Sequence, residues 1–203
     1  MVVTAIKQCS PGRFSVEFDS GETLLSTLDA VSDARLYVGT ELDREAFEEL
    51  KRSSSKSLDR QKALEILSRR PYSRRELKDK LLRGGAEEQR AEDCVAWLAE
   101  RGFLDDAEYA GAVARHYSAK GYGPGRVKSE LRRRGIDREL TDETLSELPE
   151  NTEKLDAFIA RRLSDPSDRN SVRKVSAALF RRGYSWEEIR AALRRYDCET
   201  EED

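Results

Sequence analysis

The chain of 203 residues contains one histidine, His116, and three cysteines, Cys9, Cys94 and Cys198. With a single histidine, neither a metal site of several histidines nor a Ser-His-Asp triad is expected. The cysteines are odd in number, far apart and without CxxC spacing, which argues against a disulfide framework and against a zinc site. We therefore predict a protein with no metal, no cofactor and no enzymatic activity, in a reducing cytoplasm.

Long apolar runs are also missing. No stretch approaches the roughly 18 apolar residues that cross a bilayer, and the N-terminus lacks the basic-then-apolar order of a signal peptide. Hydrophobic residues make up 37% of the chain and aromatic residues only 7%. A core can then form only where apolar side chains gather on narrow helix faces. These features predict a cytoplasmic protein without membrane contact and with a large solvated surface.

Charge is abundant but unevenly divided. Charged residues make up 38% of the chain, and the net charge is -3. Residues 1–50 contain 4 Lys and Arg against 10 Asp and Glu, whereas residues 51–203 contain 33 against 30. A basic helical body can follow phosphates or an acidic protein groove, whereas an acidic head is repelled by bare nucleic acid. The two ends are therefore expected to face different partners, although so small a basic excess does not itself predict tight DNA binding.

The N-terminal residues have the period of strands. Phe14, Val16 and Phe18 alternate with polar neighbours, and two glycine-containing turns separate three such runs, which predicts a three-stranded meander. Its apolar face is expected to be covered by the acidic amphipathic stretch ELDREAFEELKR. We predict that residues 1–52 form this N-terminal part and that the serine-rich residues 53–58 are a linker.

From residue 59 onward the chain shows helical spacing and an internal repeat. The pattern is apolar-x3-apolar-x3-Gly, in which the apolar pair forms one buried stripe and the glycine ends the helix in a left-handed conformation. Its three copies are Leu77, Leu81 and Gly85; Val127, Leu131 and Gly135; and Val175, Leu179 and Gly183. Amphipathic stretches on both sides of each copy predict three units of three helices, expected to stack into an elongated, curved, mainly α-helical body. Their predicted bounds are 59–104, 105–150 and 151–198, before an acidic tail at 199–203.

Two S-x-x-E sequences mark helix starts within these units. They are Ser73 with Glu76 and Ser185 with Glu188. In this capping box the serine and glutamate side chains satisfy backbone N–H groups that the first helical turn leaves free. Trp186 follows the second box and is expected to fill the core.

The residues that carry the repeat also resemble a known family. ALEILSRRPYSRRELKDKLLRGG, FLDDAEYA and GYGPGRVKSEL are similar to the bacterial regulatory proteins of the RecX family, and the similarity extends over residues 58–196. It implies a modulator that lies in the groove of the RecA recombinase filament on single-stranded DNA. It further implies restraint of ATP hydrolysis and strand exchange by occupancy, and hence a role in recombination, DNA repair and the SOS response.

The family runs are expected to be structural. Asp105 or Asp106 can cap a helix, and the neighbouring apolar residues can anchor the first unit to the second. The glycines around Pro124 lack the Lys-Ser/Thr ending of a phosphate-binding loop, so we predict a rigid turn. A direct partner contact by the aspartates is the second choice. The structural residues are Phe103, Leu104, Asp105, Asp106, Tyr109, Gly121, Gly123, Pro124, Leu131 and Gly135.

Two clusters of basic side chains are the candidate partner-binding or DNA-binding sites. The first contains Arg126, Lys128, Arg132, Arg133 and Arg134, with Tyr117 and Tyr122 nearby. The second contains Arg181, Arg182, Arg194 and Arg195. Arg126, Arg133 and Arg134 are expected to project opposite the buried stripe, where arginine can bind phosphates or carboxylates. The alternative is an ordinary solvated helix face.

Three functions remain open at this point. A filament regulator, expected to act as a monomer, needs the recombinase for its main effect. A helix-turn-helix protein would instead bind duplex DNA alone, with sequence preference and steep salt dependence. A repeat adaptor would have an unrelated protein partner. The negative net charge favours the regulator over the direct DNA reader.

Overall fold

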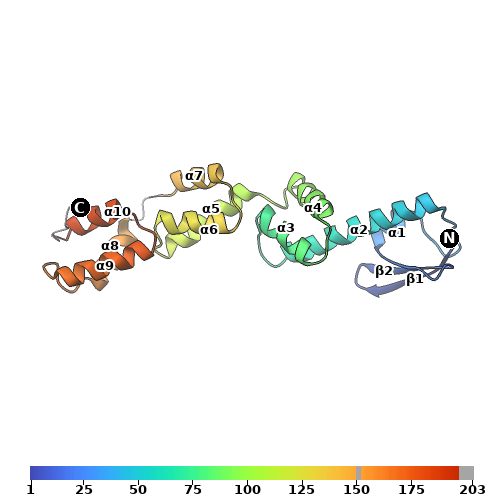
Figure 1. Ribbon diagram of the computed structural model, residues 1–203, viewed down its shortest axis with the longest axis horizontal. Helices are drawn as coiled ribbons and strands as arrows, with labels where there is room; N and C mark the ends of the chain where they lie inside the picture. Colours follow the sequence, from blue (N-terminus) through green and yellow to red (C-terminus); the bar gives the residue numbers. More distant parts are fainter. Residues whose placement is uncertain (150–151, 197–203) are drawn as a thin grey trace. The chain divides into compact units, whose positions relative to one another are not determined.

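The computed structural model describes residues 1–149 and 152–196. Within these residues the chain forms ten helices and one three-stranded sheet, so the prediction of a mainly α-helical protein with a small N-terminal sheet is confirmed (Figure 1). The fold divides into two compact units. The first comprises Met1–Tyr72 and Leu77–Leu104, and the second comprises Ser73–Glu76 and the chain from Asp105 onward.

The N-terminal sheet is the predicted meander. Its strands are β1 (Val3–Ser10), β2 (Arg13–Phe18) and β3 (Thr23–Thr27), and they are antiparallel in the order β1-β2-β3. Val16 and Phe18 are buried, as the alternation requires, and the Phe18 ring meets the Phe47 ring edge-on at 5.1 Å. The cover comes from the short helix α1 (Leu28–Asp33) and from the start of α2 (Arg44–Leu67).

The linker predicted at residues 53–58 is wrong, because α2 runs through it without a break. Ser54 is fully buried, and its Oγ lies 2.8 Å from Ser26 Oγ on β3. The hydroxyl of Ser57 pairs in the same way with Thr27 at 2.5 Å. These small hydroxyl side chains let the helix approach the strand closely and satisfy each other's polar groups. Serine here is a packing residue rather than a linker residue.

The end of α2 is also the first helix of the first three-helix group. It is followed by α3 (Arg74–Arg83) and α4 (Glu88–Glu100). Their shared core is built from Ala63, Tyr72, Leu77, Leu81, Ala91, Cys94, Val95, Leu98 and Leu104. One helix therefore serves two cores, with the sheet at its beginning and with α3 and α4 at its end.

The second compact unit contains two further three-helix groups. Their helices are α5 (Asp106–Ala119), α6 (Pro124–Arg133) and α7 (Arg138–Ser146), then α8 (Thr152–Arg162), α9 (Arg169–Arg181) and α10 (Trp186–Arg194). Each group has its own apolar cluster. The central helices α3, α6 and α9 carry the repeated apolar pair, and all six side chains are at most 3% exposed.

The repeated glycine ends each central helix as predicted. Gly85, Gly135 and Gly183 have φ angles of 92°, 80° and 90°. In each copy the N–H after the glycine donates to the carbonyl of the second apolar residue, as from Ile136 to Leu131 at 3.1 Å. This is the Schellman arrangement, which only glycine adopts without steric cost.

Both predicted capping boxes are present. Glu76 N–H donates to Ser73 Oγ at 3.1 Å, and Ser73 N–H donates back to the Glu76 carboxylate at 3.3 Å. Ser185 and Glu188 make the same reciprocal pair at the start of α10.

Two aromatic side chains lie elsewhere than predicted. Trp186 was expected in the core but is 51% exposed, and its ring stacks on the equally exposed ring of Phe180 at 5.0 Å. Phe103 was expected as an anchor but is 54% exposed. The physical reason is the same for both, since the buried positions nearby are already filled by Ile189 and Leu104.

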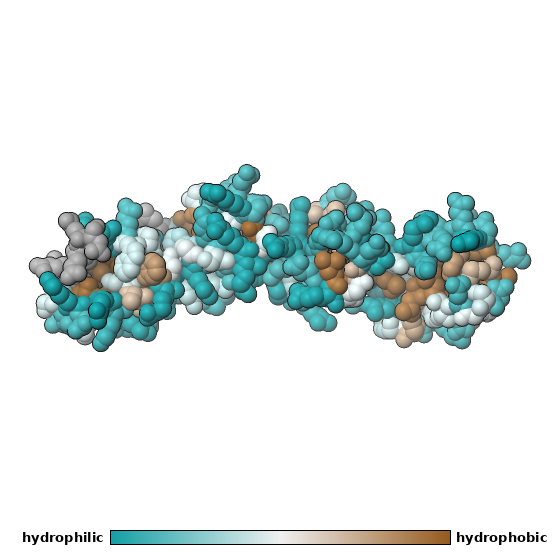
Figure 2. Space-filling view, in the orientation of Figure 1, coloured by the Kyte–Doolittle hydropathy of each residue, from teal (hydrophilic) through white to brown (hydrophobic). Residues whose placement is uncertain are grey.

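Hydrophilic side chains cover most of the face seen in Figure 2, in line with the large solvated surface expected from the composition. None of the helices in the described ranges combines the length and the apolar character needed to cross a bilayer.

Candidate functional site

The helix α6 holds the first basic cluster, and its own sequence fixes how that cluster is presented. Gly123 is the N-cap and Pro124 occupies the first turn, where its missing N–H costs nothing. Val127 and Leu131 face the core of the second three-helix group. The basic residues lie before, within and after this apolar pair, and Arg134 is the C-cap of the ten-residue helix.

A buried carboxylate organises two of these arginines. Glu130 is only 4% exposed, and its Oε1 accepts hydrogen bonds from Arg133 and Arg134, both at 2.7 Å. A second bond joins Arg133 Nε to Glu130 Oε2 at 2.9 Å. The bonds from Arg133, more than offsetting burial, lower the pKa of Glu130 to about 2, with Arg134 adding to the effect. Glu130 is therefore charged at neutral pH and balances part of the cluster.

Arg134 does not project to solvent opposite the buried stripe, so that part of the prediction is wrong. Its side chain is 22% exposed, and its guanidinium also donates to the Tyr109 hydroxyl. Tyr109 in turn donates to a Glu76 carboxylate oxygen at 2.8 Å. The reason is its place beside the glycine turn, where the side chain crosses to α5 instead of following the exposed face of α6. Arg134 is a structural residue of the second compact unit.

Lys128 is held by an ion pair with α7. Its Nζ lies 2.5 Å from Asp142 Oδ1, and this bond lowers the pKa of Asp142. Arg126 and Arg132 are exposed, and in the described part of the chain neither forms an ion pair. Arg126 lies 6.0 Å from the ring of Tyr122.

The two candidate tyrosines are neighbours. Tyr117, in the last turn of α5, and Tyr122, in the turn that follows, have ring centroids 5.5 Å apart, and both are half-buried. His116 lies against Tyr117 at 5.7 Å. The tyrosines therefore form a small aromatic cluster beside the basic helix, as their sequence positions indicate.

The second basic cluster also contains both arginines held by intrachain contacts and exposed arginines. Arg182 donates to the carbonyls of Gly121 and Lys120 at 3.1 and 3.3 Å, and its guanidinium lies over the Phe158 ring at 4.6 Å. Arg195 pairs with Asp156 at 2.5 Å. Arg181 and Arg194 are exposed and have no ion pair among the described residues.

The glycine-rich turn is a joint between two three-helix groups. Gly123 N–H donates to the Arg182 carbonyl, and Gly125 N–H donates to the Gly183 carbonyl, both at 2.9 Å. A Cβ on Gly123 would lie 2.6 Å from the backbone of Gly183, and one on Gly183 would lie 2.2 Å from Arg126 N. The prediction of a structural turn agrees with this geometry. The N-terminus of α6 and the C-terminus of α9 meet backbone to backbone, which only glycine permits.

A related contact lies at the other end of α6. Ser73 Oγ donates to the Arg134 carbonyl at 2.5 Å, within the second compact unit. Ser73 and Gly123 both precede the repeated apolar pair by four residues, and Arg134 and Arg182 both precede its glycine by one. The contacts at the two ends of α6 therefore use equivalent positions of the repeat.

The FLDDAEYA run also has structural contacts. Asp105 accepts from the N–H groups of Ala107 and Glu108 at 2.9 and 3.0 Å and so caps α5. Asp106 Oδ1 accepts from Arg74 N–H at 2.9 Å, which gives the first turn of α3 a carboxylate cap. Leu104 and Tyr109 are buried, at 3% and 8% exposure. Each of these contacts is structural, although Asp105 itself is exposed.

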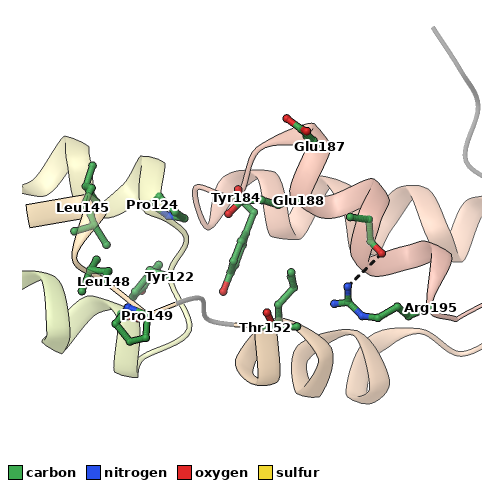
Figure 3. Close-up of a pocket in the computed structure, with 14 residues that line it drawn as sticks. Tyr122, Pro124, Leu145, Leu148, Pro149, Thr152, Tyr184, Glu187, Glu188 and Arg195 are labelled. Carbon is green, nitrogen blue, oxygen red and sulfur yellow. Dashed lines mark hydrogen bonds between the residues drawn. The ribbon is translucent and has the colours of Figure 1, made fainter. Parts of the chain in front are cut away.

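Sequence reasoning missed a pocket of about 470 Å³ between the second and third three-helix groups (Figure 3). Tyr122 and Tyr184 line it together with Leu145 and Leu148. Arg195, another lining residue, is paired with Asp156, which does not line the pocket. The lining residues come from five helices, α5, α6, α7, α8 and α10, and from turns between them, so no local sequence pattern could have indicated this pocket.

The described residues contain no metal site. The acidic, cysteine and histidine side chains there form no group that could hold a metal ion. Burial raises the pKa of the Cys94 thiol to about 11, so this thiol is protonated at neutral pH, and Cys9 is exposed. Cys198 lies outside the described residues.

Solved structures share this fold. The crystal structure of a regulatory protein RecX matches with a TM-score of 0.75 at 22% identity and covers 95% of this chain and 98% of its own. The crystal structure of RecX from Lactobacillus salivarius matches with a TM-score of 0.64 at 25% identity, over 70% of this chain and 97% of its own.

Sequence comparison identifies the family. The model of the first three-helix domain of RecX matches residues 60–98, and that of the second matches residues 105–145. The regulatory protein RecX of Xanthomonas axonopodis pv. citri is 39% identical over 142 residues, which cover 68% of this chain and 87% of the relative. That of Stenotrophomonas maltophilia is 38% identical over 143 residues, with 68% and 85% covered. The chain therefore belongs to the RecX family of regulatory proteins.

Proposed function

We propose that this protein binds the RecA recombinase filament on single-stranded DNA and lowers its ATPase and strand-exchange activities. The observation that carries the proposal is its membership of the RecX regulatory family. The protein acts by occupancy, as a cytoplasmic monomer without a chemical step of its own, and so limits recombination and repair.

The proposed contact surface is the exposed part of the two basic clusters. Arg126, Arg132 and Arg133 on α6 are exposed. The side chain of Arg133 is 70% exposed, although it is also bound to Glu130. The guanidinium groups of arginines can bind either the phosphates or the acidic side chains of a nucleoprotein filament. Arg134, Arg182, Arg195 and Lys128 are left out of this surface because intrachain contacts hold them.

The test is the single-stranded-DNA-dependent ATPase of the cognate recombinase, titrated with this protein. Wild type is expected to inhibit below one molecule per recombinase. A variant with Arg126, Arg132 and Arg133 changed to alanine is expected to lose at least about tenfold in potency, which corresponds to about 1.4 kcal/mol.

The matched control removes the same charge elsewhere. Arg44, Lys51 and Lys56 are exposed on α2, and their change to alanine is expected to leave inhibition unchanged. Equal losses in both variants would mean that net charge, not this surface, determines binding. No effect of wild type at saturation would favour the direct DNA-binding alternative, which duplex binding without recombinase then checks.

A further inference from the structure

An exposed aromatic pair lies in the third three-helix group. Phe180, near the end of α9, and Trp186, at the start of α10, have ring centroids 5.0 Å apart and an interplanar angle of 18°. Each is 51% exposed. Large aromatic side chains are normally used to build cores or interfaces, so two of them stacked at the surface require another explanation.

The three-helix fold does not need this pair. Relative to the repeated glycine, the equivalent positions are Arg132 and Arg138 in the second group and Leu82 and Glu88 in the first. Both of those groups form the same helices with their own buried clusters. The apolar cluster of the third group includes neither Phe180 nor Trp186. The pair is therefore an addition to the repeat and not part of its framework.

The three-helix group that carries the pair has an excess of positive charge. Between Thr152 and Tyr196 the chain has eleven Lys and Arg against six Asp and Glu, whereas residues 105–149 have eight against nine. Arg181 follows Phe180 directly and is exposed. Arg190 lies four residues after Trp186, on the same side of α10. The excess of positive charge thus lies in the group that carries the aromatic pair.

We propose that Phe180 and Trp186 form a stacking site for an unpaired base of a single-stranded nucleic acid, with phosphates bound by the arginines beside them. Aromatic faces combined with basic side chains are the recognition chemistry of single-stranded nucleic acids, because each base offers a π-face and each nucleotide a negative charge. Bases in a duplex are already stacked, so single strands are the preferred ligand. This binding needs no recombinase, and the inference therefore goes beyond the proposed function.

The experiment measures binding of a fluorescent oligothymidylate of about 16 nucleotides to the full chain without recombinase. Changing Phe180 and Trp186 to alanine is expected to weaken binding by about fivefold to 100-fold. The slope of log Kd against log salt is expected to stay the same, because stacking releases no counterions. Changing Phe103 to alanine, an equally exposed aromatic in the other compact unit, is the matched control and is expected to have no effect.

A second variant separates stacking from charge. Phe180→Arg with Trp186→Arg installs the residue type that the second group has at these positions and adds two positive charges. A stacking site predicts weaker binding of this variant than of wild type, whereas a purely electrostatic site predicts tighter binding and would overturn the proposal. Quenching of Trp186 fluorescence by the oligonucleotide, measured in a Trp97→Phe background, is the direct readout of a base on the ring.

Three results would contradict the site. They are absence of oligonucleotide binding at low salt, unchanged binding by the alanine variant, and binding without quenching of Trp186. If the alanine variant binds the oligonucleotide normally but loses inhibition of the recombinase, the pair is a protein contact instead. Loss of oligonucleotide binding with unchanged inhibition would support the site and leave the proposed function intact.

Discussion

The side chain of Glu130 shows how one residue combines burial with charge. It lies almost completely inside the second three-helix group but is held ionised by Arg133 and Arg134. A buried carboxylate is stable in this form only if its hydrogen-bond acceptors are satisfied. Here the two arginines supply that compensation, and Arg134, which is only 22% exposed and also bound to Tyr109, is thereby unavailable to a partner.

This arrangement predicts a pH dependence of stability. The pKa of Glu130 is lowered from 4.5 to about 2 in the folded chain, first by its bonds with Arg133. The stability that ionised Glu130 contributes to the folded chain is then complete above the pKa of the unfolded chain. It is lost as the pH falls from about 4.5 towards about 2. The difference in unfolding free energy between wild type and Glu130→Gln is expected to shrink over this range in urea titrations. A difference of constant size would contradict the prediction, and Glu143→Gln on the exposed side of α7 is the control.

Arg134 should matter for stability where its neighbour Arg132 does not. Arg134→Ala removes the hydrogen bonds that Glu130 Oε1 and the Tyr109 hydroxyl accept from Arg134, which should cost about 2 kcal/mol. Arg132→Ala removes an exposed side chain and should change stability by less than about 0.5 kcal/mol. Urea unfolding of the two variants checks this, and equal effects would mean that the buried network contributes nothing.

At the scale of elements, the central helices of the repeat end alike but do not meet the same surroundings. Gly85 and Gly183 have nearly the same φ angle, but a Cβ on Gly85 would meet nothing within 4 Å. The Cβ of Gly183→Ala would instead lie 2.2 Å from the backbone nitrogen of Arg126. Gly85→Ala is therefore expected to cost about 1 kcal/mol from the left-handed backbone alone, and Gly183→Ala about 3 kcal/mol. Thermal unfolding of both variants tests the contact between the end of α9 and the start of α6. Similar losses of stability in the two variants would rule out a close contact at Gly183.

The course of α2 could not be found from local sequence. Serine-rich residues 53–58 have low helix propensity and no apolar stripe, which is typical of a linker. Their hydroxyls pair with side chains of β3, which are distant in sequence. Tertiary packing outweighs weak local propensity here, because a helix of 24 residues is stabilised at both ends by different cores.

At the scale of the whole molecule, the acidic N-terminal part should weaken binding to any polyanion. Changing the exposed residues Glu41, Glu45 and Glu48 to glutamine raises the net charge from -3 to zero. Binding of the oligothymidylate is expected to tighten about twofold or more at low salt, through the long-range field. The gain should vanish near 1 M salt, where the Debye length is about 3 Å. The same three residues changed to aspartate keep the charge, and an equal gain in that variant would contradict the explanation.

The sequence by itself determined the features that depend on local pattern. The alternation of Phe14, Val16 and Phe18 predicted the strand, the capping boxes predicted helix starts, and the repeated glycine predicted three helix ends. Each follows from backbone geometry within a few residues, so the local pattern was enough to predict it. The family signature, too, is a property of residue order alone.

Only the tertiary structure decided which side chains of each pattern are exposed. Arg133 and Arg134 are neighbours in sequence, yet one is 70% exposed and the other is bound to Tyr109. Trp186 has the sequence context of a core residue but lies on the surface beside Phe180. Exposure depends on what other elements place against a residue, and those elements are tens of residues away. For that reason the sequence could indicate the basic helix, while the division between structural and available side chains required the fold.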